Sequence, residues 1–181
     1  MSKKGIKETI IKKINIKIEN KNNIKISGKF GNITKNKLKI EYFFLIIKKN
    51  KKLFLYPKIW NKNTKLNWCT YKTIISNLIK GINKQYKEII ILKGIEYSIK
   101  INKNIIIIKI GFSKKVKIKI PKSIKINYIN KKEIEVNCCN LEKLGNFIGK
   151  LKKIRKYNLY KDKGIRKKYE VIKLKEIKNK K

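Results

Sequence analysis

The amino-acid sequence predicts an α+β protein of two similar small domains, each an antiparallel β-sheet packed against one α-helix, with a basic C-terminal tail. Apolar and polar residues alternate through the first third of the chain and again between residues 87 and 136, which is the period of half-buried strands. Each stretch is followed by a segment whose apolar residues recur at helical spacing. Strands followed by a helix, twice over, fit two two-layer modules. We place the domains at residues 1–83 and 84–170, and the tail at 171–181.

The first domain is expected to begin with short strands. Isoleucines alternate with polar residues at 14–18 and again at 24–26. The glycines at the two ends of 28–31 mark a tight turn. A longer strand is expected from 38 to about 47, and the lysine-rich residues after it lead into a further strand at 53–56, which makes a hairpin.

A helical stripe comes next and is expected to lie on the preceding sheet. Gly81 is near the end of this stripe, where glycine often closes a helix. The apolar residues of the stripe are Tyr71, Ile74, Ile75, Leu78, Ile79 and Ile82.

The second domain repeats this order of strands and helix. Residues 102–104 are expected to form a hairpin turn, and Pro121 should bound a strand because proline cannot donate to a central ladder. The strand-like segments are 87–92, 97–101, 105–110, 116–120, 125–129 and 133–136. The second helical stripe is Leu141, Leu144, Phe147, Ile148, Leu151 and Ile154.

The charge of the chain points to a polyanionic partner. Its 51 Lys and Arg residues outweigh 11 Asp and Glu, for a formal net charge of +40, which repels itself in a compact protein. Nucleic acid is the commonest polyanion, and an anionic membrane surface is the main alternative. The absence of alanine and the abundance of Lys, Asn and Ile also indicate an AT-rich genome, so any one lysine face can be a solvated surface. Codon bias alone would not sustain this charge without an anionic partner.

Other classes of protein fit the sequence less well. Hydrophobic residues make up 41% of the chain, enough for a core, which argues against wholesale disorder. The first residues lack the apolar run of a signal peptide, and the longest apolar stretches are too short to span a bilayer, so we expect a soluble protein. With no histidine and only Cys69, Cys138 and Cys139, we expect no metal site, and the cysteines to be small buried or half-buried residues in a reducing compartment.

Catalytic groups are also scarce, and we expect no enzyme activity, no cofactor and no small-molecule substrate. The usual acid–base residue, histidine, is missing, and Asp162 is the only aspartate. Glu133 and Glu135 are the closest pair of acids; we interpret them as charge partners of neighbouring lysines. No phosphate-binding glycine loop or nucleophile elbow is present in the sequence.

Basic and aromatic residues are concentrated together after residue 150. Lysine and arginine neutralise phosphates, and tyrosine rings stack on unpaired bases. Arg155 and Arg166 are the only arginines, and arginine binds phosphate bidentately where lysine is a point charge. Gly164 is expected to let the backbone approach RNA closely or turn sharply. The candidate RNA-binding residues are Arg155, Lys156, Tyr157, Tyr160, Lys161, Lys163, Gly164, Arg166, Lys167, Lys168 and Tyr169. The alternative interpretation is a solvated basic tail.

Five motifs, in order, resemble those of the bacterial-type large-subunit ribosomal protein six family over nearly the whole chain. Ile26-Ser-Gly-Lys-Phe-Gly31 is similar to the family's Gly-Lys-x-Gly turn, and residues 70–82 to its first helix and exit. Leu92-Lys-Gly-Ile-Glu-Tyr97 resembles Leu-x-Gly-Val-Gly-Tyr, and Gly111-Phe-Ser113, with Ile120-Pro121 beyond, falls where the family has Leu-Gly-Phe-Ser-His-Pro. Tyr160-Lys-Asp-Lys-Gly-Ile-Arg166, with Glu170 beyond, resembles Tyr-Lys-Gly-Lys-Gly-Ile-Arg.

The chain departs from this family pattern in its loops. Glu96 and Asp162 replace glycines, and Cys69 stands where the family has glycine before the helix. Lysines at 114 and 115 replace His-Pro, and the prolines before the terminal signature are absent.

The resemblance implies a structural component of the large ribosomal subunit. Members have two similar sheet-and-helix domains, and the C-terminal domain and tail bind large-subunit ribosomal RNA near the sarcin-ricin loop and the stalk base, beside neighbouring ribosomal proteins. Carried over to this chain, the expected contacts are Arg155, Tyr160, Lys161, Lys163, Gly164, Arg166 and Lys168. A free-standing RNA-binding or RNA-chaperone module is the alternative, and a peripheral membrane protein comes after it.

Composition and motifs together indicate where the protein works. Bacterial-type motifs in so AT-rich a sequence suggest a reduced genome. We expect an organellar ribosome, first of a plastid, one that can be non-photosynthetic. A mitochondrion or the cytoplasm of an endosymbiont is the alternative.

Overall fold

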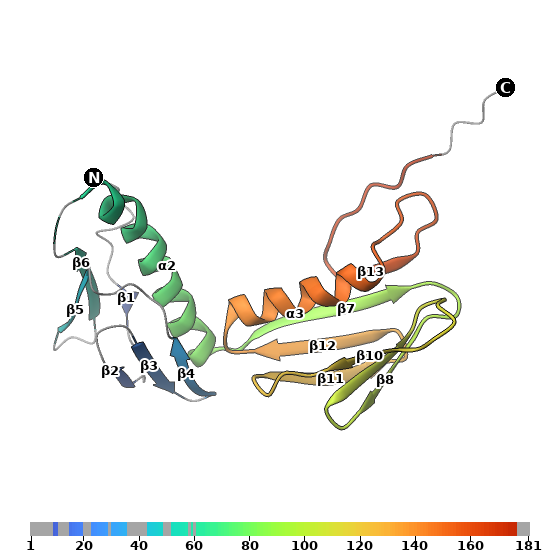
Figure 1. The fold of residues 1–181 in the computed structure, drawn as a ribbon, viewed down its shortest axis with the longest axis horizontal. Coiled ribbons are helices and arrows are strands. Elements are labelled where there is room, and N and C mark those ends of the chain that lie inside the picture. Colours follow the sequence, from blue (N-terminus) through green and yellow to red (C-terminus); the bar gives the residue numbers. More distant parts are fainter. Residues whose placement is uncertain are drawn as a thin grey trace. The chain divides into compact units, whose positions relative to one another are not determined.

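A computed structural model of the chain describes residues 9–10, 15–19, 23–28, 30–35, 43–48, 52–57, 59 and 61–176. The chain divides into two compact units. The first consists of residues 1–85 and 139–141, and the second of residues 86–138 and 142–181. Figure 1 shows the elements of each unit along the chain.

The described strands of the first unit form two three-stranded antiparallel sheets, with the orders β1-β6-β5 and β2-β3-β4. The predicted turn at 28–31 is confirmed, because Gly28 and Gly31 are register partners at the end of a hairpin. The hairpin of β5 and β6 is confirmed as well, while residues 38–42 of the predicted long strand lie outside the described residues. The strands are β1 (Thr9–Ile10), β2 (Asn15–Glu19), β3 (Asn23–Gly28), β4 (Gly31–Lys35), β5 (Phe43–Lys48) and β6 (Lys52–Pro57).

Helix α2 (Lys62–Asn83) carries the predicted stripe, of which Ile75, Leu78, Ile79 and Ile82 are buried. The helix begins earlier than the stripe indicated, and the backbone N–H of Asn61 donates to the Thr64 hydroxyl at 2.8 Å at its start. Cys69 therefore lies inside the helix, and its expected place before the helix is wrong. Gly81 does not close the helix either, since the helix continues to Asn83 and the Lys84 N–H caps the Lys80 carbonyl at 2.8 Å.

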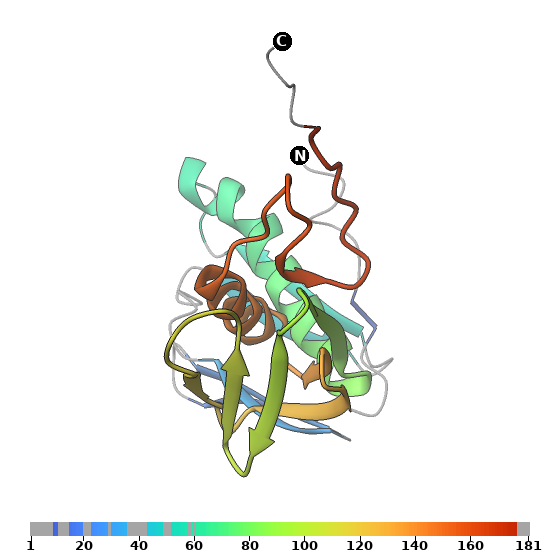
Figure 2. The ribbon, with the colours of Figure 1, turned by 90° about the vertical axis from the view of Figure 1, so that its right-hand side faces the viewer.

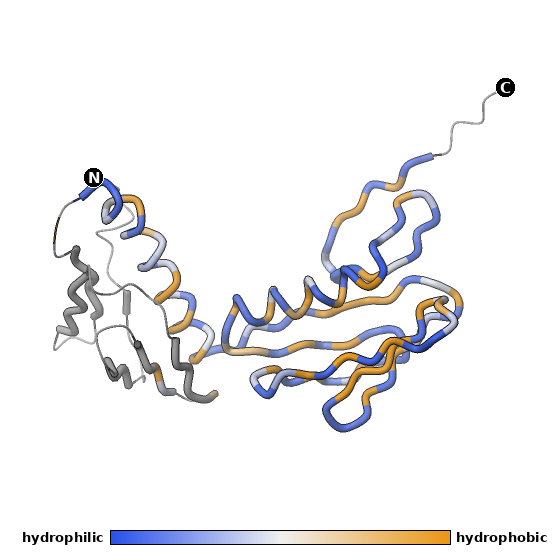
Figure 3. The backbone as a smooth tube through the Cα atoms, in the orientation of Figure 1, coloured by the Kyte–Doolittle hydropathy of each residue, from blue (hydrophilic) through white to orange (hydrophobic). Residues whose placement is uncertain are grey.

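The second unit contains all six predicted strands and one that was not predicted. They form a four-stranded antiparallel sheet in the order β11-β12-β7-β13 and a three-stranded sheet in the order β10-β9-β8. Figure 3 shows hydrophobic and hydrophilic residues alternating along strands such as β10 and β12, and a longer hydrophobic run along β7. The strands are β7 (Tyr86–Lys93), β8 (Ser98–Asn102), β9 (Ile105–Lys109), β10 (Val116–Lys119), β11 (Ile124–Asn130), β12 (Glu133–Cys138) and β13 (Gly164–Lys167).

Helix α3 (Leu141–Ile154) and both sheets of the second unit share one core. The stripe residues Leu144, Phe147, Ile148 and Leu151 are buried in a cluster with inward-facing residues of both sheets. Leu141, at the start of the stripe, is exposed. Pro121 follows β10 as expected, and the 102–104 turn is confirmed, with Lys103 at a φ of 48°.

The predicted fold class is confirmed: α+β, with antiparallel sheets and a helix in each unit. In each unit the described strands are divided between two sheets, whereas the sequence predicted one sheet per domain. The sequence could not show this, because alternation identifies strands but not the strands with which they pair. The unpredicted strand β13 pairs antiparallel with β7, with Ile165 opposite Leu92 and both side chains buried. Residues 171–176, at the start of the predicted tail, have no regular secondary structure.

Candidate nucleic-acid interface

The candidate residues lie on one segment of the second unit, which we call the C-terminal segment (residues 155–170). It leaves the end of α3, turns through a loop at residues 158–163 and returns along the edge of the four-stranded sheet as β13 (Figures 1 and 2). The loop is closed by the Asn158 N–H, which donates to the Lys163 carbonyl at 2.8 Å. The Asn158 side-chain oxygen accepts from the N–H groups of Tyr160 and Lys161 at 2.8 and 3.1 Å. These hydrogen bonds fix Asn158, Tyr160, Lys161 and Lys163 relative to one another.

Gly164 joins this loop to β13 and is buried. Its φ is +139°, and a Cβ built on it would lie 2.6 Å from the Tyr157 Cα and 2.8 Å from the Lys156 carbonyl oxygen. A non-glycine residue would therefore meet backbone atoms in a conformation that side chains rarely adopt. We expected the backbone at this glycine to approach RNA closely or to turn sharply. In the structure, the close approach is to the backbone of Lys156 and Tyr157, which brings the two arms of the loop into contact.

Several predicted contact residues are held in interactions inside the second unit. The Lys167 ammonium lies 3.1 Å from Glu88 on β7, and that of Lys168 lies 3.4 Å from Glu133 on β12. The Arg166 guanidinium lies over the Tyr157 ring, 5.7 Å from its centroid, and donates to the Glu170 carbonyl at 3.4 Å. These interactions stabilise the position of the segment; Lys167 and Arg166 are half-buried, whereas Lys168 remains exposed.

Glu170 is the main anchor at the end of the segment. Its carboxylate accepts from the Lys152 ammonium of α3 at 2.7 and 2.8 Å, and from the Lys167 N–H at 3.2 Å. The hydrogen bond from Lys152 lowers the pKa of Glu170 below its ordinary value. Burial opposes this shift in pKa, and the Lys167 N–H and the two positive charges add to it. Glu170 is therefore ionised near neutral pH and ties β13 to α3.

The remaining candidates face solvent. Arg155 is exposed and its guanidinium lies 5.2 Å from the centroid of the Phe112 ring, in cation–π range. The Tyr160 ring, at the tip of the loop, is 55% exposed, and that of Tyr169 is 81% exposed. The lysines among these remaining candidates are Lys156, Lys161 and Lys163, and all three are exposed. The segment thus presents cations and aromatic rings to solvent, while most of its other charged residues form ion pairs within the second unit.

The two closest acids behave as interpreted from the sequence. Glu133 pairs with Lys168, and Glu135 with Lys87 at 3.4 Å. Both are charge partners of lysines, so this interpretation is confirmed. Among the described residues, no cluster of three potential metal ligands occurs.

The cysteines match the expectation of small buried or half-buried residues. Cys138 is buried and Cys69 and Cys139 are half-buried, with no disulfide among the described residues. None of the helices in the described ranges has the length and apolar character needed to cross a membrane.

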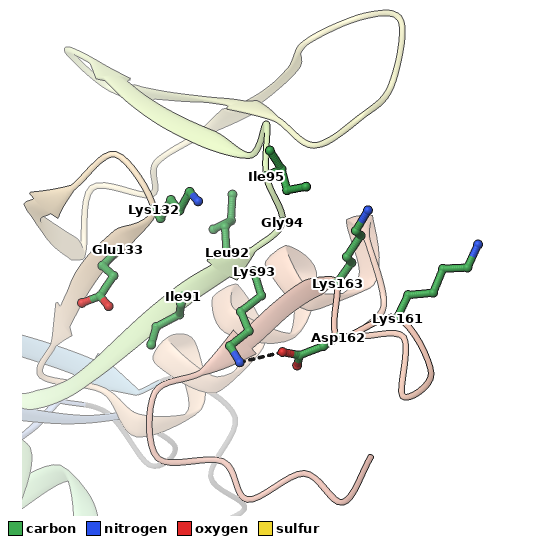
Figure 4. A pocket seen from close by; sticks show the side chains of 10 residues that line it. All are labelled: Ile91, Leu92, Lys93, Gly94, Ile95, Lys132, Glu133, Lys161, Asp162 and Lys163. Carbon is green, nitrogen blue, oxygen red and sulfur yellow. Dashed lines mark hydrogen bonds and ion pairs between the residues drawn. The ribbon is translucent and has the colours of Figure 1, made fainter. Parts of the chain in front are cut away.

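A hollow of about 420 Å³ adjoins the 158–163 loop and was not predicted (Figure 4). Three segments line it: the end of β7 with residues 94–95, the turn before β12 at 132–133, and residues 161–163. An ion pair between the Lys93 ammonium and Asp162, 2.8 Å long, joins the first segment to the third. Sequence motifs marked Asp162 only as a departure, and no local pattern connects it to a lysine so far away in the chain.

Comparison with known proteins finds relatives that carry the same family name, large ribosomal subunit protein uL6 or uL6m. No family model matches the chain. It is 33% identical over 174 residues to large ribosomal subunit protein uL6 of Phytoplasma mali, covering 92% of this chain and 91% of the relative. It is 26% identical over 166 residues to uL6 of Trichodesmium erythraeum, covering 92% and 90%. It is also 35% identical over 113 residues to uL6m of Reclinomonas americana, covering 62% and 61%.

Proposed function

Because the chain belongs to the large ribosomal subunit protein uL6 family, we propose that it is a structural component of the large ribosomal subunit and binds ribosomal RNA through its C-terminal segment. The observation that carries this proposal is the set of exposed cations and rings on a segment held in place by ion pairs. In this proposed role the protein catalyses no reaction. It stabilises the fold of ribosomal RNA near the place where translation proceeds.

The internal ion pairs make the segment suitable for this role. Acids at Glu88, Glu133 and Glu170 neutralise lysines that fix β13, so the outward residues are presented on a rigid support. Preorganised cations lose less conformational entropy when they meet phosphates than cations on a loose tail. Phosphate contacts would supply most of the affinity, and the shape of the RNA the specificity.

The family resemblance supports a proposal for the finer location on the ribosome. We propose contacts near the sarcin-ricin loop and the base of the stalk, with neighbouring ribosomal proteins as further partners. Chemical footprinting of large-subunit RNA, with and without the protein, tests this location. Protection confined to other RNA helices would contradict it.

We further propose an organellar ribosome, first of a plastid. The AT-rich composition supports this, as do relatives named uL6c and uL6m in plastid- and mitochondrion-bearing organisms, such as the uL6c of Phaeodactylum tricornutum. Detection of the protein in purified plastids, and its sedimentation with large subunits, is the expected result. Sedimentation in light fractions instead would favour a free-standing RNA-binding protein.

A salt titration with charge variants tests the RNA-binding role. Each phosphate contact adds about 0.7–0.9 to the slope of log affinity against log salt, so Arg155→Ala/Lys156→Ala should lower the slope by about 1.5. The matched control is Lys100→Ala/Lys117→Ala, which removes equal charge from exposed positions on β8 and β10. An affinity insensitive to salt, or equal losses in both double variants, would count against the proposal.

A further inference from the structure

The hollow beside the 158–163 loop has the charge balance of a site for an anionic ligand. Its two acids are already used: Asp162 pairs with Lys93 at 2.8 Å and Glu133 with Lys168 at 3.4 Å. The other three lysines of its lining are exposed and form no ion pair with any described residue. These are Lys132, Lys161 and Lys163. The hollow therefore carries an uncompensated positive charge.

An apolar surface stands in the same hollow. Ile95 lines the hollow and is 86% exposed. Figure 4 shows Ile95 between Lys132 on one side and Lys163 on the other, while Lys161 extends from the same loop as Lys163 and lies farther from Ile95. A ligand bound here would meet an aliphatic side chain between two groups of ammonium ions.

The hollow is held open by bonds between the segments that line it. The Leu92 N–H donates to the Lys132 carbonyl at 2.9 Å, which ties the turn before β12 to the end of β7. The Lys93–Asp162 ion pair ties the 158–163 loop to the same strand, and Asp162 holds a φ of 50° there. Both sides of the hollow are thus fixed to β7.

We propose that this hollow receives a single unpaired nucleotide of the bound RNA, an inference that rests on the proposed RNA-binding function. The base lies against Ile95, and Lys132, Lys161 and Lys163 neutralise the phosphates on either side of it. The size agrees, because about 420 Å³ lies within the roughly 300–1,000 Å³ of small-ligand sites. A paired base would have its faces covered by stacking, whereas an unpaired base offers both a flat apolar face and flanking charge.

The test uses the full-length protein and a large-subunit RNA transcript. Ile95→Asp replaces the apolar contact with a negative charge at an exposed position and should weaken binding roughly tenfold, the scale of one base contact. Leu66→Asp is the matched control, since Leu66 is 68% exposed on α2 and undergoes the same change of charge. Its affinity should remain within about twofold of that of the unaltered protein.

Chemical probing of the RNA locates the nucleotide. The unaltered protein should protect one unpaired nucleotide that becomes reactive again with Ile95→Asp while the rest of the footprint persists. Lys132→Gln/Lys163→Gln should expose the same nucleotide, which provides a second test if Ile95→Asp impairs folding. If both variants leave the footprint intact and Ile95→Asp binds as tightly as Leu66→Asp, the nucleotide site is refuted while RNA binding stands. If the unaltered protein shows no salt-dependent RNA binding, the proposed function itself fails.

Discussion

Replacing Gly164 with alanine should destabilise the second unit more than any other single glycine-to-alanine change described here. The new Cβ would lie 2.6 Å from the Tyr157 Cα, so the two backbone arms must separate by roughly 1 Å to reach ordinary carbon–carbon contact. The φ of +139° adds strain of about 1–3 kcal/mol, and the forced shift about 1–3 kcal/mol more. Together these predict a loss of about 2–6 kcal/mol in the free energy of unfolding.

Thermal unfolding followed by circular dichroism measures this loss. For a domain of this size, each kcal/mol lowers the melting temperature by about 4–8 °C, so a fall of at least about 8 °C is expected. Gly145→Ala is the control, because a Cβ there meets no atom within 4 Å and alanine favours a helix by about 1 kcal/mol. A Gly164→Ala protein that melts at or above the temperature of Gly145→Ala would refute the reasoning.

Three further outcomes are expected. The pKa of Glu170 in the folded protein lies below its ordinary value near 4.5, so its stabilising effect is complete above that pH and is lost as the pH falls through the lower folded-state pKa. In Glu170→Gln, the free energy of unfolding should no longer fall with pH in this acidic range. The difference from the unaltered protein should be at most about 1 kcal/mol, because the ion pair is partly exposed, and urea unfolding at several pH values measures it. Phe112→Leu should change stability by no more than about 1 kcal/mol, yet weaken RNA binding by freeing Arg155; unchanged affinity in filter binding would contradict this. Asp162→Asn should keep the loop conformation, since asparagine tolerates positive φ, but lose the ion pair to Lys93 and raise amide hydrogen exchange in residues 158–163.

The strands and helix of the second unit were predictable because its core is aliphatic and its surface is lysine. In β12 the buried Ile134 and Val136 alternate with Glu133 and Glu135, and this alternation is readable from the sequence. In β7 and β9 several apolar residues run together, so the sequence indicates a strand but not which of its faces is buried. The start of α2 was not predictable in the same way, because its first turns are mostly polar and exposed, with Thr64 and Trp68 as buried exceptions.

Strand β13 was missed for a related reason. It is four residues long, its single buried large side chain is Ile165, and it lies within a run of basic residues. Its partner β7 lies far away in sequence, so its pairing leaves no local pattern. The cations of the C-terminal segment were predictable from the sequence, but the sequence could not separate those without an acidic partner from Lys167 and Lys168, which form ion pairs. That separation depends on acids such as Glu88, 79 positions away from its lysine partner.

The position of β13 makes the fold of the second unit depend on its last described strand. It is the last strand in chain order among those described, yet it is hydrogen-bonded to β7, the first strand of its unit. A nascent chain can form the β11-β12-β7 portion earlier, but the sheet edge and its anchoring ion pairs await residues 164–170. The closed edge of this sheet therefore depends on residues 164–170, and the outward cations lose their fixed support without them.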